Sequence, residues 1–263
     1  MDYSSYKFIR TERRGRILVL TLHNPPMNTV QMELHNELSR IFLDVQVDHE
    51  ADVIVLTGSG EVFSAGGDIP NMQRRIDDPE LFNRKNVEMK RIVFGLIELE
   101  KPIICRINGD CMGLGATLAL LCDIIIAVNT ARIGDPHVKM GYVAGDGGAV
   151  IWPQLVGFAR AKKYLLLGDT LTATEAERIG LINHAVPAAD LDTRVNYIAD
   201  RLARGATKAI RWTKTCVNLQ LRQIAHAQLD ASLAYEALTN IGADHQEAVN
   251  AFKEKRRPQF TGR

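Results

Sequence analysis

The sequence has little imbalance of charge and no long apolar run. Its 263 residues include 32 Lys and Arg against 31 Asp and Glu, which gives a formal net charge of +1. Such a balance provides no basic field of the kind that attracts nucleic acid or an anionic membrane surface. No stretch approaches the roughly 20 apolar residues that span a bilayer, because Asp123 interrupts the longest candidate, 114–128. We therefore expect neither nucleic acid nor a membrane as a partner.

Cysteine is scarce and shows no redox or metal pattern. Cys105, Cys111, Cys122 and Cys216 have no C-x-x-C spacing, and most of them lie in apolar segments. This usage is typical of buried, reduced thiols. The first fifteen residues are polar and charged and lack the apolar stretch of a secretory signal. Both observations predict a cytoplasmic protein.

Several catalytic motifs are absent as well. The sequence contains no G-x-x-x-x-G-K-[ST], no H-E-x-x-H and no G-x-S-x-G. The histidines are scattered without metal-ligand spacing, so we expect no bound metal. Three G-x-G fragments lack the rest of the dinucleotide fingerprint.

Apolar runs alternate with helical patterns over the first half of the chain. Strands are predicted at 16–22, 53–57, 102–107 and 123–128. Helices are predicted around 34–45, where apolar residues recur at spacings of three and four, around 80–98, and after Gly113. This alternation indicates an α/β protein.

The second half of the chain is mainly helical. A loop region at 134–148 precedes helices predicted near 149–155 and 159–167. Thr172 and Glu175 have capping-box spacing, so a helix should begin at about residue 173. From Leu191 onward the pattern is wholly helical, in three or four segments.

Three glycine-rich segments follow predicted strands, at 64–68, 109–115 and 141–148. Ligand sites favour the ends of strands, where backbone amides are free. Two such amides that converge on a carbonyl oxygen form an oxyanion hole. Tight turns without a binding role are the alternative explanation for the glycines.

Seven segments of the chain occur in the order of a known family pattern. They are FSAGGD at 63–68, KPIICRING at 101–109, GLG at 113–115, CDI at 122–124, LGD at 167–169, AERIGL at 176–181 and FKEKR at 252–256. The first is similar to the motif F-x-A-G-x-D of the crotonase superfamily, the enoyl-CoA hydratase/isomerase proteins, and the chain resembles this family over most of its length.

The resemblance implies a ClpP-like ββα superhelix over 1–200 and a C-terminal helical region over 201–263 that drives trimer formation, so a homotrimer or hexamer is expected. It also implies an acyl-CoA substrate, as in fatty acid metabolism, with coenzyme A present only as part of that substrate. The thioester oxygen would bind to the amides of Gly67 and Leu114. The residues implied for CoA binding are Ser64, Ala65, Gly66, Asp68, Ile69 and Lys255.

The sequence departs from the family pattern at the catalytic positions. Thr117 and His137 stand where hydratases carry two glutamates, and Pro70 replaces a lysine that often follows the first motif. A threonine hydroxyl is no general base at neutral pH. We expect His137 to act as the base with Asp146 orienting it, a pattern similar to that of the 6-oxocamphor hydrolase branch. Glu236 matches the active-site glutamate of that branch.

Structural roles without chemistry remain open for these residues. Asp146 is a suitable N-cap for the following helix, His137 could be a loop residue bonded to backbone, and Glu236 could be a solvated charge on a helix face.

The leading functional prediction is an enzyme that acts on an acyl-CoA thioester. The alternatives are a CoA-independent β-diketone hydrolase, which Leu114 and Lys255 disfavour, and a catalytically silent CoA-binding or RNA-binding relative.

The C-terminal helical region also suggests assembly. Apolar positions between 191 and 235, namely Leu221, Ile224, Leu229 and Leu233, exceed what a solvated tail needs. Such stripes usually meet another surface. Combined with the family resemblance, this pattern predicts a homotrimer or hexamer.

Overall fold

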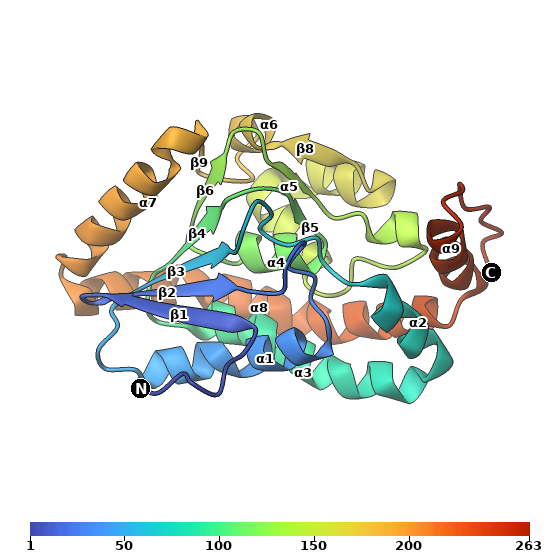
Figure 1. The fold of residues 1–263 in the computed structure, drawn as a ribbon, viewed down its shortest axis with the longest axis horizontal. Helices are drawn as coiled ribbons and strands as arrows, with labels where there is room; N and C mark the ends of the chain where they lie inside the picture. Colours follow the sequence, from blue (N-terminus) through green and yellow to red (C-terminus); the bar gives the residue numbers. More distant parts are fainter.

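A computed structural model describes the whole chain, residues 1–263, and contains two sheets with helices packed around them (Figure 1). The larger sheet has six strands in the order β1-β2-β3-β4-β6-β9. These strands are β1 (Ile9–Arg14), β2 (Ile17–Leu22), β3 (Val53–Gly58), β4 (Ile103–Ile107), β6 (Ile124–Val128) and β9 (His184–Val186). Only the β1–β2 pair is antiparallel; the other neighbours are parallel. Every residue of β3 is buried, as is typical of a parallel strand covered on both faces.

A smaller sheet lies next to the first and holds two of the glycine-rich segments together. It consists of β5 (Cys111–Met112), β7 (Arg132–Gly134) and β8 (Thr170–Thr172). Ser64 pairs with Cys111 as an isolated parallel bridge, and the Met112 amide donates to the Ser64 carbonyl at 2.9 Å. This pairing places the segments 63–68 and 109–115 side by side, although 40 or so residues separate them in sequence.

Helices pack against the sheets and form most of the outer part of the molecule. They are α1 (Met32–Val47), α2 (Ile69–Asp77), α3 (Pro79–Glu98), α4 (Leu114–Leu120), the short 3₁₀ helix η1 (His137–Met140), α5 (Gly148–Leu167), α6 (Ala173–Arg178), α7 (Ala188–Ala203), α8 (Thr207–Asn240) and α9 (Ala243–Lys253). The predicted stripe of α1, including Leu34, Leu38 and Ile41, is fully buried. Figure 1 shows α1 and α3 running along one face, and α2 and α9 together at the end far from the N-terminus.

The α/β class predicted from the sequence is confirmed, and so are the four predicted strands. The two helices expected at 149–155 and 159–167 are confirmed as the two parts of α5, which Gly157 separates with a non-helical conformation (φ 75°, ψ 160°). Thr172 caps α6 as predicted, because its side chain accepts from the Glu175 amide. The edge strand β1, the helix α2 and the short strands β5, β7, β8 and β9 were not predicted.

The apolar stripe near the C-terminus has a different role from the one expected. Leu229 and Leu233 on α8 are buried in the chain's own core, and Leu221 and Ile224 pack against that core. The surface that the stripe meets is therefore the chain's own core, since α8 packs against α3 and α5 within one chain, and the stripe lends no support to assembly. Trimer or hexamer formation stays a prediction from the family resemblance, and so does the division of the chain at residue 200.

Two further sequence expectations concern membranes and thiols. None of the helices combines the length and the apolar character needed to cross a membrane. Cys105, Cys111 and Cys122 are buried free thiols, as expected, whereas Cys216 is exposed on α8.

Candidate active site

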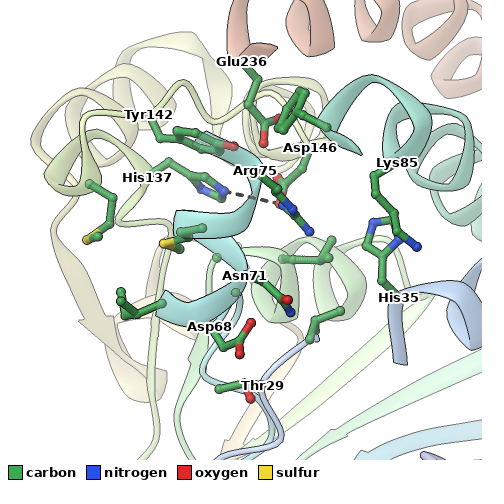
Figure 2. Close-up of a pocket in the computed structure, with 18 of the residues that line it drawn as sticks. Thr29, His35, Asp68, Asn71, Arg75, Lys85, His137, Tyr142, Asp146 and Glu236 are labelled. Atoms are coloured by element: carbon green, nitrogen blue, oxygen red, sulfur yellow. Dashed lines mark ion pairs between the residues drawn. The ribbon is translucent and has the colours of Figure 1, made fainter. Parts of the chain in front are cut away.

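A cavity of about 610 Å³ lies between α2, α3 and the glycine-rich segments, and α8 and α9 contribute to its wall. This volume is within the usual range of small-molecule sites. Figure 2 shows His137, Tyr142 and Glu236 on one side of the cavity and Thr29 and Asp68 on the opposite side. The C-terminal region therefore helps to build the site in its own chain, through Leu233 and Glu236 of α8 and Phe252 of α9.

Two unused backbone amides line this cavity. Neither Gly67 nor Leu114 donates its amide N–H to another backbone group, and Leu114 is the first residue of α4. A glycine with positive φ precedes each of them: Gly66 has φ 80° and Gly113 has φ 54°. Glycine adopts such angles without the steric cost that a side chain would add. The two turns also approach each other closely, because a Cβ atom on Gly113 would lie 3.8 Å from the Gly66 Cα.

His137 lies between two carboxylates. Its Nδ1 contacts Asp135 Oδ1, and its Nε2 lies 3.4 Å from Asp146 Oδ2. Thr117 donates its hydroxyl to the other oxygen of Asp146 at 3.2 Å. Asp135, rather than Asp146, thus holds the Nδ1 side of the ring, which the sequence analysis did not anticipate. Asp146 itself precedes α5, whose N-cap is Gly147 without a side-chain cap.

The surroundings of His137 determine its charge. Burial alone would lower the pKa of the imidazole, but the negative charges of Asp135 and Asp146 outweigh burial and raise that pKa well above its usual range. Burial raises the pKa of Asp146, and the charge of His137 outweighs it, so the pKa of this carboxyl is lowered. A positively charged imidazole between two carboxylates donates protons rather than accepting them. The direction of these pKa shifts favours Asp146 as the acceptor of the pair, and the role of His137 as the base stays a prediction.

Glu236 reaches the same cavity from α8. It is 5% exposed, and its Oε2 has no hydrogen-bond partner. Burial and the neighbouring charge of Asp146 raise the pKa of this carboxyl to about 8. The raised pKa favours the protonated form of the glutamate, and the burial of the side chain shows that the alternative of a solvated helix-face charge is wrong. Gly145 packs against it, since a Cβ atom there would lie 2.7 Å from Oε2.

Asp135, His137 and Asp146 also have the spacing of a metal site, with ligand atoms within 4.8 Å of one another. Both imidazole nitrogens, however, already face a carboxylate oxygen. The arrangement favours protons shared along the three groups over a metal ion, which would need a free nitrogen lone pair.

The residues implied for CoA binding divide into two groups. Ala65, Asp68 and Ile69 line the cavity, and Asp68 Oδ1 is buried there without a hydrogen-bond partner. Ser64 lies behind this wall. Its hydroxyl donates to the Asn28 carbonyl at 2.7 Å and accepts from the Gly66 amide at 3.2 Å.

Gly66 and Lys255 do not line the cavity either. Gly66 shapes the turn before Gly67, and Lys255 is exposed just after α9. The side chain of Leu114, by contrast, does line the cavity, as expected from its bulk relative to glycine.

Sequence reasoning missed three groups that line or support the cavity: Asp135, Tyr142 and Arg75. Asp135 is two residues before His137, a spacing that could have suggested a pair. Tyr142 stacks on His137, with ring centroids 6.0 Å apart and an interplanar angle of 11°, and donates to Asn240 at 3.0 Å. Arg75 is on α2, which was not predicted at all, so no signal in the sequence marked it.

Comparisons with known proteins identify the class to which this fold and site belong. Residues 12–263 match the enoyl-CoA hydratase/isomerase family. A probable enoyl-CoA hydratase of Mycobacterium bovis is 33% identical over 264 residues, which cover 98% of this chain and 100% of that protein. The chain therefore belongs to the enoyl-CoA hydratase/isomerase family, the crotonase superfamily.

Solved structures agree with this assignment. The crystal structure of an enoyl-CoA hydratase/isomerase from Mycobacterium paratuberculosis is similar with a TM-score of 0.88 and 31% identity, over 92% of this chain and 97% of that one. A β-diketone hydrolase from the cyanobacterium Anabaena, bound to (S)-3-oxocyclohexyl acetic acid, is similar with a TM-score of 0.85 and 27% identity, over 91% of this chain and 96% of that one. The crotonase fold predicted from the sequence is confirmed.

Proposed function

We propose that this chain is an enzyme that acts on an acyl-CoA thioester and stabilises an enolate during the reaction. The observation that carries the proposal is the pair of unused amides, Gly67 and Leu114, in the same cavity as His137 and Asp146. Preorganised N–H donors stabilise negative charge that develops on a carbonyl oxygen. A thioester carbonyl bound by both amides would therefore have a more acidic α-carbon.

In this proposal the His137–Asp146 pair replaces the two hydratase glutamates. Asp146 accepts a proton from the α-carbon or from an attacking water, and His137 keeps the carboxylate oriented through Nε2. Asp135 fixes the ring through Nδ1, in the manner of a carboxylate that holds an imidazole. The protonated Glu236 has a proton to donate to the substrate later in the reaction.

The CoA portion of the substrate would contact the segment from Ser64 to Ile69, of which Ala65, Asp68 and Ile69 line the cavity. Lys255, exposed near the C-terminus, is suited to the CoA phosphates by its charge. No cofactor besides the coenzyme A of the substrate enters the proposal.

A second candidate function is the hydrolysis of a carbon–carbon bond in a β-diketone without CoA. His137, Asp146 and Glu236 meet in one cavity, as the sequence predicted for this alternative, and the Anabaena β-diketone hydrolase is similar in fold. Leu114 argues against it, since it stands at the position where that branch was expected to carry a histidine.

Calorimetric titration separates the two candidates. Free CoA and butyryl-CoA are titrated against the protein, and 2-alkylcyclohexane-1,3-dione is incubated with it and followed by NMR for ring opening. We expect butyryl-CoA to bind in the micromolar range, more tightly than free CoA, and the diketone to remain intact. Ring opening without measurable binding of either CoA ligand would replace the thioester proposal with the hydrolase.

A further inference from the structure

Arg75 is a cation in the cavity wall that has no counter-ion. It lies on α2 and lines the cavity, and its Nε is buried without a hydrogen-bond partner. No carboxylate forms an ion pair with its guanidinium group. Its recorded contacts are with two aromatic side chains: the ring of Phe82, 6.0 Å from the centroid, and the hydroxyl of Tyr142. Buried polar groups are nearly always paired, so an exception in a binding cavity calls for a ligand that completes it.

The other charged groups of the cavity are already compensated or have a different partner. Lys85 and His35 both contact Glu88, with Nζ–Oε2 at 2.8 Å and Nδ1–Oε2 at 2.7 Å. Asp146 and Asp135 share His137. The two other carboxyl groups of the cavity, Asp68 and Glu236, form no ion pair with Arg75 or with any other cation, and each has one buried oxygen without a hydrogen-bond partner.

Arg75 acts at the catalytic end of the cavity. Its positive charge opposes the rise in the pKa values of Glu236 and Tyr142, which burial causes, so the guanidinium lies near both groups. Figure 2 shows the side chain between the His137–Asp146 pair and the pair formed by His35 and Lys85. The phosphates of CoA are separated from the thioester by the long pantetheine arm. A group bound by Arg75 must therefore belong to the acyl portion of the ligand.

We propose that the acyl group carries a carboxylate, which binds to the guanidinium group of Arg75. The planar fork of arginine donors matches a carboxylate in two parallel hydrogen bonds and is preferred over lysine for such contacts. The inference rests on the proposed function, because it assumes that an acyl-CoA occupies the cavity. It narrows the substrate class to CoA monothioesters of dicarboxylic acids or of similarly substituted acids.

A competing role for Arg75 is that of a fixed counter-charge to Asp135, Asp146 and Glu236. In that role its removal would change the cavity for every ligand in the same way. A substrate carboxylate, by contrast, makes the effect of Arg75 depend on the ligand. The experiment therefore compares ligands that differ only in this group.

Three matched pairs of saturated thioesters provide the comparison: succinyl-CoA with butyryl-CoA, glutaryl-CoA with pentanoyl-CoA, and adipoyl-CoA with hexanoyl-CoA. Each pair shares chain length and the CoA portion. None contains the double bond that hydration requires, so calorimetry measures binding without that reaction. For wild-type protein we expect at least one carboxylate ligand to bind about tenfold or more tightly than its neutral partner, as a charge-assisted contact in a partly dry cavity would give.

Arg75→Met removes the charge and retains most of the side-chain length. We expect the preference ratio of the best pair to fall to about one, and Arg75→Lys to retain part of it. Arg74→Met is the matched control, since Arg74 is the exposed neighbour on α2 and lies outside the cavity. It should leave the ratio unchanged.

The outcomes separate the inference from the proposed function. If neutral thioesters bind and no carboxylate partner binds more tightly to the wild type, only the inference fails. An equal loss for both members of a pair in Arg75→Met would also overturn it and assign the counter-charge role. If no thioester of any pair binds to wild-type protein, the proposed function and the inference fail together.

Discussion

One wall of the cavity is built from backbone, and the other from charged side chains. The backbone wall consists of the segments 63–68 and 109–115, where Gly66 and Gly113 turn the amides of Gly67 and Leu114. The charged wall contains His137, Asp146, Glu236 and Arg75. The backbone amides of the first wall carry the same partial charges at any pH, whereas the side chains of the second wall gain and lose protons. The comparison suggests a division of roles. The amides of the backbone wall would stabilise the enolate, and the side chains of the charged wall would determine the substrate and the reaction.

The largest effect should come from the centre of the charged wall. Asp146→Asn keeps the size of the side chain and removes the proton acceptor, and His137→Ala removes the group that orients it. We expect either change to lower kcat by about 10²–10⁴-fold with little change in KM, the usual contribution of general acid–base catalysis. Turnover of 2-enoyl-CoA substrates of four to six carbons, measured for each variant, checks this.

Two further variants make this test specific. The double variant should be little slower than either single one, because groups that act as one unit are not additive. Asp135→Asn keeps His137 in place with a neutral partner on Nδ1, so we expect a smaller loss, of about tenfold. A rate for Asp146→Asn close to that of wild type would remove the pair from the mechanism.

The backbone wall is tested by a substitution that strains the main chain and changes no charge. Gly113 has φ 54° and ψ −126°, angles that a residue with a Cβ atom adopts only with strain of about 1–3 kcal/mol. A Cβ atom there would meet the His137 ring at an ordinary 3.6 Å, so the strain rather than a clash is the main effect. We expect Gly113→Ala to reorient the Leu114 amide and to cost about 10–10²-fold in turnover, less than a full oxyanion donor.

Gly60→Ala is the matched control for strain. Gly60 has φ 69°, nothing lies within 4 Å of its added Cβ atom, and it is outside the cavity. Both variants should lose similar stability in thermal melts, and only Gly113→Ala should lose turnover. The probe is acetoacetyl-CoA, whose enolate absorbs in the near ultraviolet and should be stabilised by wild type and by Gly60→Ala. An unchanged enolate signal in Gly113→Ala would argue against an oxyanion hole at Leu114.

The strands and helices of the fold differ in how well the sequence predicts them. Buried parallel strands are continuous apolar runs, so β2, β3, β4 and β6 were predictable to within a residue or two. The edge strand β1 buries only Ile9 among its six residues, and the others are mostly charged. It therefore lacks the apolar pattern by which a strand is predicted. Helix α2 buries only Asn71 and therefore has no apolar stripe to reveal it.

The backbone wall was also easier to predict than the charged one. Its glycines lie in local motifs, and the family resemblance of those motifs implies the amides of Gly67 and Leu114 as donors. The charge of His137 depends on Asp135 and Asp146 together, which no spacing rule supplies. Arg75 enters the cavity only because α2 packs against α3 and α9. Such contacts are properties of the tertiary structure, so the charge state and the unpaired arginine were not visible in the sequence.

The last contrast concerns stability rather than turnover. It compares two glutamates, Glu236 in the charged wall and Glu88 behind it, whose pKa values shift in opposite directions. Burial and Asp146 raise the pKa of Glu236 to about 8. For Glu88, the contacts with His35 and Lys85 outweigh burial and lower the pKa to about 2. Between about pH 5 and 8 the unfolded chain loses the proton of Glu236 while the folded protein retains it, so stability falls as pH rises, by at most about 1.4 kcal/mol per pH unit. Glu236→Gln cannot ionise and removes this slope.

Thermal melts from pH 3 to 8.5 test this contrast. The melting temperature of Glu236→Gln should rise relative to wild type from pH 5 to 8 and level off above that, because the glutamate is then ionised in both states. Glu88→Gln has the opposite sign: the ionised carboxylate stabilises the folded protein above about pH 4.5, and this contribution is lost as pH falls toward 2. Its melting temperature should therefore lie below wild type at pH 7 and approach it in acid. Parallel pH curves for Glu236→Gln and wild type would mean that Glu236 is ionised in the folded protein at neutral pH, and the charged wall would then hold one more negative charge for Arg75 to balance.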